Sequence, residues 1–122
     1  LEQLFTQFPA LADKHRDKAG TLSGGQRQFL AIAMALAAEP RMILMDEPSA
    51  GLSPKAAQEV LEHVRALTED GVSVLLVEQN AHLALTASNR AYVIEQGRIM
   101  KSGVSKELAD DPEITALYLG QD

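Results

Sequence analysis

The chain has 122 residues, 46% of them hydrophobic, which suits one globular domain or a part of a larger one. It has no cysteine, which excludes disulfides, thiolate nucleophiles and zinc sites built on cysteine. The formal net charge of −6 argues against a nucleic-acid partner, and no run of about 18 apolar residues is present to span a membrane. Since the sequence begins at Leu1 rather than at methionine, we expect a fragment of a longer protein.

The first part of the chain is expected to be helical. Residues 1–8 form a short amphipathic run that ends at Pro9. The stretch 26–38 is predicted to be a strong helix, capped by Ser23 and stopped by Pro40. Its apolar face is formed, at helical spacing, by Phe29, Leu30, Ala33, Leu36 and Ala37.

Two short apolar runs are predicted to be parallel strands. Residues 42–45 are bracketed by Pro40 and Pro48, which favours a strand over a piece of buried helix. Residues 72–77 form a second run, rich in β-branched side chains. Because both runs are continuously apolar rather than alternating, we expect parallel strands that are covered on both faces.

Helices and a hairpin complete the predicted order. The helix between the strands begins at Ser53-Pro54 and ends at Gly71. Its buried stripe is formed by Val60, Leu61, Val64 and Leu67. The elements expected after the second strand are, in order, a helix at 81–87, a hairpin with strands at 91–94 and 98–100 around Gln96-Gly97, and a last helix from Asp111-Pro112 to near Gly120.

Alternation of strands and helices predicts an α/β fold, with a parallel sheet, flanking helices and a C-terminal β-hairpin. In such sheets, ligands bind at the carboxyl ends of the strands. Asp46-Glu47 and Glu78-Gln79 both follow predicted strands, so we expect these two pairs to face one site.

Residues 22–26, Leu-Ser-Gly-Gly-Gln, lead into the first long helix and are suited to bind an anion. Gly24 and Gly25 allow the backbone to approach a ligand closely. The Ser23 hydroxyl and the N–H groups at the start of a helix form an anion site. Taken alone, the stretch is equally well explained as a glycine-containing helix cap.

The acidic pair Asp46-Glu47 is suited to chemistry on a phosphate. Carboxylate oxygens can hold Mg²⁺, usually through water, and a second carboxylate can orient or deprotonate an attacking water. Because successive strand residues point to opposite faces, we expect the two carboxylates to have different roles. Taken alone, the pair is also explained as the polar end of a strand.

Together, in order and at this spacing, these motifs resemble the ABC ATPase family over nearly the whole chain. Residues 22–26 are similar to its signature motif, and Met42–Asp46 to its Walker B strand, followed by Glu47 as the catalytic glutamate. The family's D-loop is matched by Ser49, Ala50, Gly51, Leu52 and Ser53. The resemblance implies the C-terminal half of an ABC ATPase domain, a P-loop NTPase fold. In that half, residues 1–38 would end the helical subdomain and 39–122 would belong to the catalytic core.

The resemblance also implies a role for each motif. Ser23, Gly24, Gly25 and Gln26 would contact the γ-phosphate of ATP bound to the opposite subunit. Asp46 would hold the hydration shell of Mg²⁺, and Glu47 would polarise the hydrolytic water. Residues 49–53 would lie along the interface between two ATPase subunits.

Gln79 departs from the broader family, in which this position is usually a histidine that touches the γ-phosphate. Glutamine can donate a hydrogen bond but does not carry a proton near neutral pH. We therefore expect a positioning role in catalysis, or a plain polar residue at a strand end. A resemblance to the ATPases of branched-chain amino-acid importers, to which urea and amide importers are similar, is carried by residues 75–80, the short alanine-rich helix that follows, and residues 91–94, 96–99 and 118–120.

Other candidate sites are weak. Gly20 and Gly25 have P-loop spacing but are followed by Gln26-Arg27, so the P-loop is absent from this sequence. The histidines lack metal-ligand spacing; we expect His63 to be solvated and His82 to be an exposed helix residue. We predict that the chain alone does not hydrolyse ATP and that it self-associates through open strand edges.

Three functions follow from the sequence. The first is the ATP-binding and hydrolysing subunit of an ABC importer for branched-chain amino acids, at the cytoplasmic face of the plasma membrane, of which this chain would be a fragment that is inactive alone. Its partners would be a second ATPase subunit, transmembrane permease subunits and, indirectly, a substrate-binding protein. The alternatives are a soluble ABC ATPase of DNA repair or translation, and a non-catalytic binding module that truly lacks the P-loop.

Overall fold

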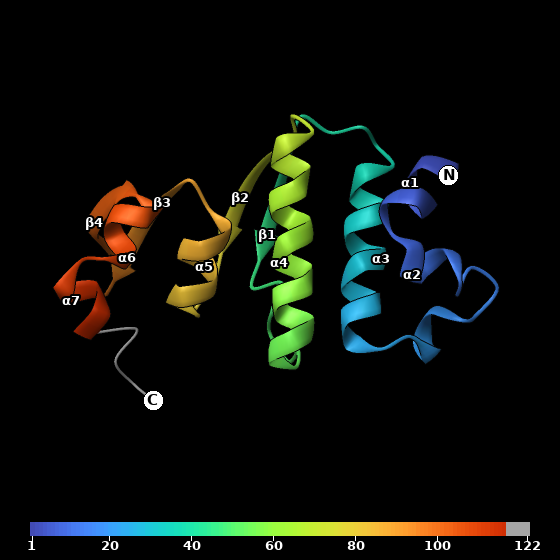
Figure 1. Cartoon of the computed structure of the whole chain (residues 1–122), viewed down its shortest axis with the longest axis horizontal. Helices are drawn as coiled ribbons and strands as arrows, with labels where there is room; N and C mark the ends of the chain where they lie inside the picture. Colours follow the sequence, from blue (N-terminus) through green and yellow to red (C-terminus); the bar gives the residue numbers. More distant parts are fainter. Residues whose placement is uncertain (117–122) are drawn as a thin grey trace. The chain divides into compact units, whose positions relative to one another are not determined.

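The computed structural model describes residues 1–116 (Figure 1). Two compact units divide the chain, the first from Leu1 to Leu75 and the second from Leu76 onward, so the boundary falls inside a strand. None of the helices within residues 1–116 has the length and apolar character that a membrane crossing requires. The predicted division between a helical subdomain and a catalytic core at residue 38 lies inside the first unit, where helices on both sides of residue 38 pack together. That division stays a prediction.

The helices of the first unit are α1 (Glu2–Gln7), α2 (Pro9–Ala12), the 3-10 turn η1 (Ala19–Thr21), α3 (Gly24–Leu36) and α4 (Pro54–Glu69). The predicted end of the first run at Pro9 is confirmed, and Pro9 also begins α2. Proline is favoured at the first position of a helix because its missing N–H would have no partner there.

Helix α3 begins two residues earlier than predicted, because Ser23 forms a complete capping box with Gln26. Phe29 and Ala33 are buried, as predicted, whereas Ala37 is exposed. The buried face instead includes Ile32, which the predicted stripe left out. The face that packs is therefore rotated toward position 32, and this rotation is set by the helices that α3 contacts rather than by its own pattern.

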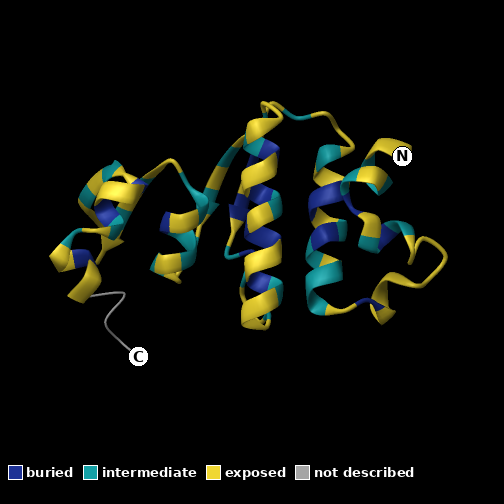
Figure 2. Ribbon diagram, in the orientation of Figure 1, coloured by how far each residue is buried: buried dark blue, intermediate teal, exposed yellow. Residues whose placement is uncertain are grey.

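Helix α4 follows the prediction closely. Ser53 caps it by accepting a hydrogen bond from the Ala56 N–H at 3.3 Å, and Pro54 is its first residue. The chain leaves the helix through Gly71, whose φ of +89° is in the region that favours glycine. Its buried residues are Ala57, Val60, Leu61, Val64 and Leu67. Figure 2 shows buried positions repeating along both α3 and α4.

His63 is half-buried and packed against aromatic rings rather than solvated, so this prediction is wrong. Its ring stacks on Phe8 with centroids 5.1 Å apart and lies 4.7 Å from the ring of Phe29. Its Nε2 is 3.1 Å from the carbonyl oxygen of Gln7. His63 lies on the side of α4 that meets the first helices. Its ring therefore completes an aromatic cluster with Phe8, which is only 1% exposed, and Phe29.

Strands β1 (Met42–Asp46) and β2 (Ser73–Val77) pair in a two-stranded parallel sheet, joined through α4. Ile43 and Met45 are buried, but Leu44 is 72% exposed and Met42 51%. Among the described residues, one side of this strand is covered and the apolar side chains on the other side are exposed. The expectation of two covered faces is therefore wrong for β1, and it is also wrong for β2, in which no residue is buried and Leu75 and Val77 are exposed.

The second unit contains α5 (Ala81–Ala87), β3 (Arg90–Glu95), β4 (Arg98–Val104), α6 (Ser105–Ala109) and α7 (Pro112–Ile114). The bounds of α5 agree with the prediction, and β3 pairs with β4 in the predicted antiparallel hairpin. Gln96 and Gly97 both have positive φ, +48° and +76°, as a two-residue type I′ turn requires. Leu85, Leu108 and Ile114 form the core of this unit.

Helix α6 was not predicted. It has five residues, and its N-cap has no side-chain hydrogen bond, so its sequence carries no start signal. The helix is fixed instead by tertiary contacts: Ser105 is 1% exposed, and its hydroxyl lies 2.7 Å from that of Ser88. Leu108 is the apolar side chain through which α6 joins the core.

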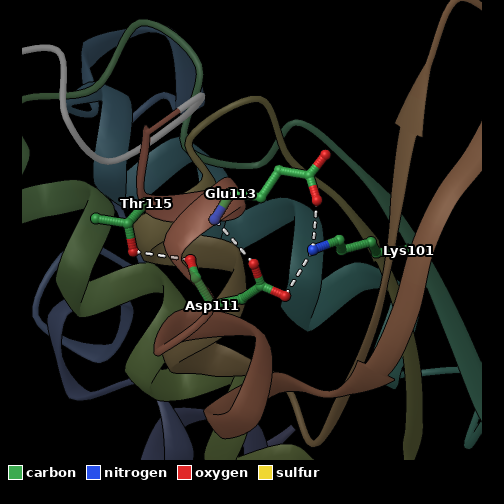
Figure 3. A network of polar contacts seen from close by, with 4 residues as sticks. All are labelled: Lys101, Asp111, Glu113 and Thr115. Carbon is green, nitrogen blue, oxygen red and sulfur yellow. Dashed lines mark hydrogen bonds and ion pairs between the residues drawn. The ribbon is translucent and has the colours of Figure 1, made fainter.

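A polar network holds the start of α7 against β4 (Figure 3). Lys101 Nζ donates to Asp111 at 2.7 Å and lies 2.6 Å from the Glu113 carboxylate. The other Asp111 oxygen accepts the Glu113 N–H at 2.9 Å, which is the predicted cap of the last helix. The hydrogen bond from Lys101 holds the pKa of Asp111 below its usual value, and the same bond raises the pKa of Lys101. The predicted helix end near Gly120, and Tyr118-Leu119-Gly120, lie outside the described residues.

Candidate functional site

The start of α3 presents an exposed serine at the tip of a thirteen-residue helix. The Ser23 hydroxyl accepts the Gln26 N–H at 3.2 Å, and the Ser23 N–H donates to Gln26 Oε1 at 3.0 Å. These bonds use the side chain of Gln26 for the cap. The N–H groups of Gly24 and Gly25 belong to the first turn of the helix, where no intrahelical acceptor exists, so they are the groups suited to an anion.

Gly24 also has a reason inside the chain to be glycine. A β-carbon on Gly24 would lie 3.0 Å from Cδ2 of Leu52, and one on Gly25 would lie 3.4 Å from the β-carbon of Ala56. The start of α3 therefore packs closely on the loop and first turn of α4. The sequence explained these glycines by access for a ligand, and at Gly24 the tight packing against Leu52 favours glycine as well, whereas a β-carbon on Gly25 would make an ordinary van der Waals contact.

The end of β1 carries two carboxylates in different backbone conformations. Asp46 is the last residue of the strand and is exposed, on the same open side as Met42 and Leu44. Glu47 is half-buried and has a φ of +47°, in the left-handed region. A residue other than glycine in that region costs about 1 kcal/mol or more and is held there by its surroundings.

The direction of Glu47 is not set by strand alternation. We expected Asp46 and Glu47 to point to opposite faces of a regular strand, but β1 ends at Asp46. The left-handed conformation of Glu47 turns the chain out of the sheet, so strand alternation does not apply to this residue, and the expectation of different roles stays a prediction. The two carboxylates still differ in environment, because Asp46 is exposed and Glu47 is half-buried.

Residues 49–53 form consecutive tight turns rather than an extended loop. The Ala50 N–H donates to the Glu47 carbonyl oxygen at 3.0 Å, and the Leu52 N–H donates to the Ser49 carbonyl oxygen at 3.1 Å. Gly51 has a φ of +72°, which favours glycine at this position. This segment therefore connects the acidic strand end to the cap of α4 with a defined shape.

Gln28 joins the two candidate motifs within the first unit. Its side-chain Nε2 donates to the carbonyl oxygen of Pro48 at 2.6 Å, across twenty residues of sequence. The helix that begins at Ser23 and the residues that follow Asp46 are thus fixed to each other. Sequence reasoning missed Gln28, because a single glutamine inside a helix carries no signal of the backbone group that it contacts.

Gln79 belongs to the second unit, is exposed, and lies between β2 and α5. Its neighbour Asn80 caps α5 by accepting the Leu83 N–H at 3.0 Å. The expectation that Glu78 and Gln79 share a site with the carboxylates of the first unit stays a prediction. His82 is exposed, as predicted.

The acidic strand end fits a magnesium ion that is bound together with phosphate. Within residues 1–116, no cluster of three or more histidine, aspartate and glutamate side chains is placed to hold a metal by itself. Asp46 offers one exposed carboxylate, and one or two carboxylates are what Mg²⁺ uses when phosphate oxygens and water fill its remaining positions.

Comparison with known proteins shows which proteins this chain is similar to. A family model described as "ABC transporter" matches residues 1–50. BraG of Pseudomonas aeruginosa, a high-affinity branched-chain amino acid transport ATP-binding protein, is 42% identical over 98% of this chain and 52% of its own length. LptB of Acidithiobacillus ferridurans, a lipopolysaccharide export system ATP-binding protein, is 41% identical over 98% of the chain and 49% of its own length.

Solved structures give the same result for the fold. The ADP conformation of MJ1267, an ATP-binding cassette of an ABC transporter, superposes with a TM-score of 0.78 at 34% identity, over 98% of this chain and 50% of that one. The chain thus spans about half the length of the curated relatives that it matches.

Proposed function

The chain belongs to the ABC transporter family and has the fold of its ATP-binding cassettes, and from this premise we propose that it is part of an ATP-hydrolysing subunit of an importer. The observation that carries the proposal is the joining of two motifs in one unit. An exposed serine-glycine helix tip and an acidic strand end are fixed to each other through Gln28 and Pro48. These are the two kinds of group that a nucleoside triphosphate and its metal need.

In this proposal, the tip of α3 binds the terminal phosphate of ATP that is held mainly by a second subunit. The groups that would bind it are the hydroxyl of Ser23 and the N–H groups of Gly24 and Gly25, supported by the cap that Gln26 completes. The positive end of the helix dipole favours an anion here. The tip is exposed, which supports binding to a group on another subunit.

The acidic end of β1 supplies the chemistry of hydrolysis. Asp46 would hold the hydration shell of Mg²⁺, which, when bound, neutralises charge on the phosphates. Glu47 would orient the attacking water and take its proton. Its half-buried position supports this role, because a fixed and partly shielded carboxylate holds a water in one place better than an exposed one.

Two further parts of the proposal lie outside these motifs. Ser49, Ala50, Gly51, Leu52 and Ser53 would line the contact with the second subunit, and their tight turns support a defined surface. Gln79 would position a phosphate oxygen or the water by donating a hydrogen bond. The whole protein would use ATP and Mg²⁺ and would work with transmembrane permease subunits at the cytoplasmic face of the membrane.

The solute is proposed to be a branched-chain amino acid. The support is the similarity to BraG, at 42% identity over 98% of this chain. An exporter ATPase, LptB, is nearly as similar at 41%, which makes lipopolysaccharide export the second candidate. A soluble ABC ATPase and a module without catalysis are the remaining alternatives. The 122-residue chain alone is proposed to be inactive, because the sequence contains no P-loop.

A transport assay separates these candidates. The ATPase that contains this chain, reconstituted with its permease subunits, should hydrolyse ATP faster when leucine, isoleucine or valine is supplied with the cognate binding protein. Stimulation by lipopolysaccharide instead would establish the exporter. Hydrolysis that needs neither a permease nor a solute would favour a soluble ATPase, and its complete absence would favour the binding module.

A further inference from the structure

We propose that Gln28 is a positioning residue for Glu47. Through its hydrogen bond to Pro48, Gln28 holds the backbone that follows the acidic strand end against the helix that carries the phosphate-binding tip. The inference rests on the proposed function, in that it assigns Gln28 a part in the reaction of Glu47. Gln28 itself touches neither ATP nor water in this account. It acts through the one backbone group that follows Glu47.

The contact is short and shielded. Gln28 Nε2 lies 2.6 Å from the Pro48 carbonyl oxygen, and Pro48 is buried while Gln28 is half-buried. A buried carbonyl oxygen without a donor costs free energy, so this bond is worth more than one on the surface. Pro48 has no N–H of its own, which leaves the carbonyl oxygen as its only polar backbone group.

The backbone conformation of Glu47 requires support from neighbouring groups. Its φ of +47° is unfavourable for glutamate, so the conformation persists only where neighbouring contacts impose it. The Ala50 N–H donates to the Glu47 carbonyl oxygen at 3.0 Å, and Gln28 fixes the next carbonyl group along the chain. Together these bonds hold two consecutive peptide groups and therefore the direction in which the Glu47 side chain leaves the backbone.

The contact also connects the two motifs mechanically. Gln28 lies five residues beyond Ser23 on a helix whose start packs against Leu52 with almost no free space. In the proposed dimer, Ser23 meets the nucleotide of the partner while Glu47 serves the nucleotide of its own subunit. Movement of α3 on one nucleotide would thus reach the catalytic carboxylate of the other through Gln28.

The test compares Gln28→Leu and Gln28→Glu with Gln58→Leu in the complete ATPase that contains this chain. Gln28→Leu removes the donor, and Gln28→Glu keeps the shape but offers only acceptors. Gln58 also donates through Nε2, at 2.9 Å to Glu62, but on the exposed side of α4. Both Gln28 variants should lower kcat about tenfold, as expected for one buried hydrogen bond, while KM for ATP stays within about twofold. Gln58→Leu should change neither.

A second readout does not depend on hydrolysis. In the complete ATPase without nucleotide, the Ala50 amide donates to Glu47, so its hydrogen exchange should become faster in both Gln28 variants and stay unchanged in Gln58→Leu. Normal kcat in either folded Gln28 variant would overturn the inference. A loss of thermal stability accompanied by changes in both kcat and KM would also overturn it, because a positioning role lowers kcat and leaves KM nearly unchanged. If the parent ATPase shows no turnover, the proposed function fails, and unchanged Ala50 exchange would then overturn the positioning role separately.

Discussion

The side-chain amide of Gln28 donates to the carbonyl oxygen of Pro48 at 2.6 Å, and this bond joins the helix that begins at Ser23 to the residues that follow β1. A β-carbon placed on Gly24 would lie 3.0 Å from Leu52, so the same two segments are also in close contact nearer the tip. The candidate phosphate-binding tip and the candidate catalytic carboxylates are therefore parts of one rigid assembly rather than two separate motifs.

Glu47→Gln should abolish turnover in the complete ATPase while ATP binding remains. Glutamine keeps the shape of the side chain but cannot accept a proton from water, and loss of a general base lowers kcat by roughly 100-fold or more. The measurement is magnesium-dependent phosphate release together with nucleotide binding. Glu39→Gln is a matched control, since Glu39 is an exposed glutamate with a similar φ of +51°. Hydrolysis near the parent rate in Glu47→Gln would remove Glu47 from the mechanism.

Ser23 has two roles that substitution can separate. Ser23→Asn and Ser23→Asp both preserve a helix cap, so each should unfold within about 0.5 kcal/mol of the parent chain in urea, whereas Ser23→Ala should lose about 1 kcal/mol. Asp adds a negative charge where the phosphate is expected. ATP-driven dimerisation of the complete ATPase should therefore fail in Ser23→Asp and persist in Ser23→Asn. Equal dimerisation in these two variants would show that the tip does not meet a phosphate.

Gly24→Ala should be coupled to Leu52. The new methyl group would lie 3.0 Å from the Leu52 side chain, so one of them must move by a few tenths of an ångström. Replacing Leu52 with alanine as well should reduce the cost of Gly24→Ala by at least about 0.5 kcal/mol, measured by urea unfolding in a double-mutant cycle. Gly20→Ala, where nothing lies within 4 Å of the new carbon, is the control. Strict additivity at positions 24 and 52 would contradict the packing described here.

Asp111→Asn should weaken the second unit at neutral pH and leave it unaffected in acid. The pKa of Asp111 is lowered by Lys101, so the stability from this contact is present above the ordinary carboxyl pKa of about 4 and is lost as pH falls through the lower folded value. Asparagine keeps the cap on the Glu113 N–H but removes the charge.

The measurement for this pair is urea unfolding between neutral pH and about pH 2, followed on the second unit. The difference between the parent and Asp111→Asn should shrink below about pH 4. Asp17→Asn, which breaks the exposed pair with Lys14 at 3.1 Å, should have a smaller effect, because solvent screens that contact. A difference that is constant with pH would show that the Lys101 contact does not set the pKa of Asp111.

Local signals predicted much of the fold. The caps Ser23 and Ser53, the stripe of α4 and the Gln96-Gly97 turn were all found from the sequence, because each depends on residues close together in the chain. Helix α6 was missed because its position is set by the contact between Ser88, which is half-buried, and Ser105, which is buried, seventeen residues apart.

The candidate site was predicted as a set of residues but not as a geometry. Asp46 and Glu47 were identified by type and order, yet the left-handed conformation of Glu47 broke the strand alternation on which their directions were predicted. His63 and Gln28 were misread or missed for a related reason. Each is fixed by a group far away in the sequence, Phe8 in one case and Pro48 in the other, and no local pattern reports such a contact.

Mixing two variants of the complete ATPase tests the central claim most directly, namely that the Ser23 tip of one copy and the Glu47 strand end of another form one site. Ser23→Arg and Glu47→Gln should each be inactive alone. When they are mixed, one of the two sites in the heterodimer receives an intact Ser23 and an intact Glu47, so turnover should return. A copy with both substitutions, mixed with the parent, should give a heterodimer without turnover. Activity in that second heterodimer and none in the first would place both motifs in the same site of one copy and would contradict the account.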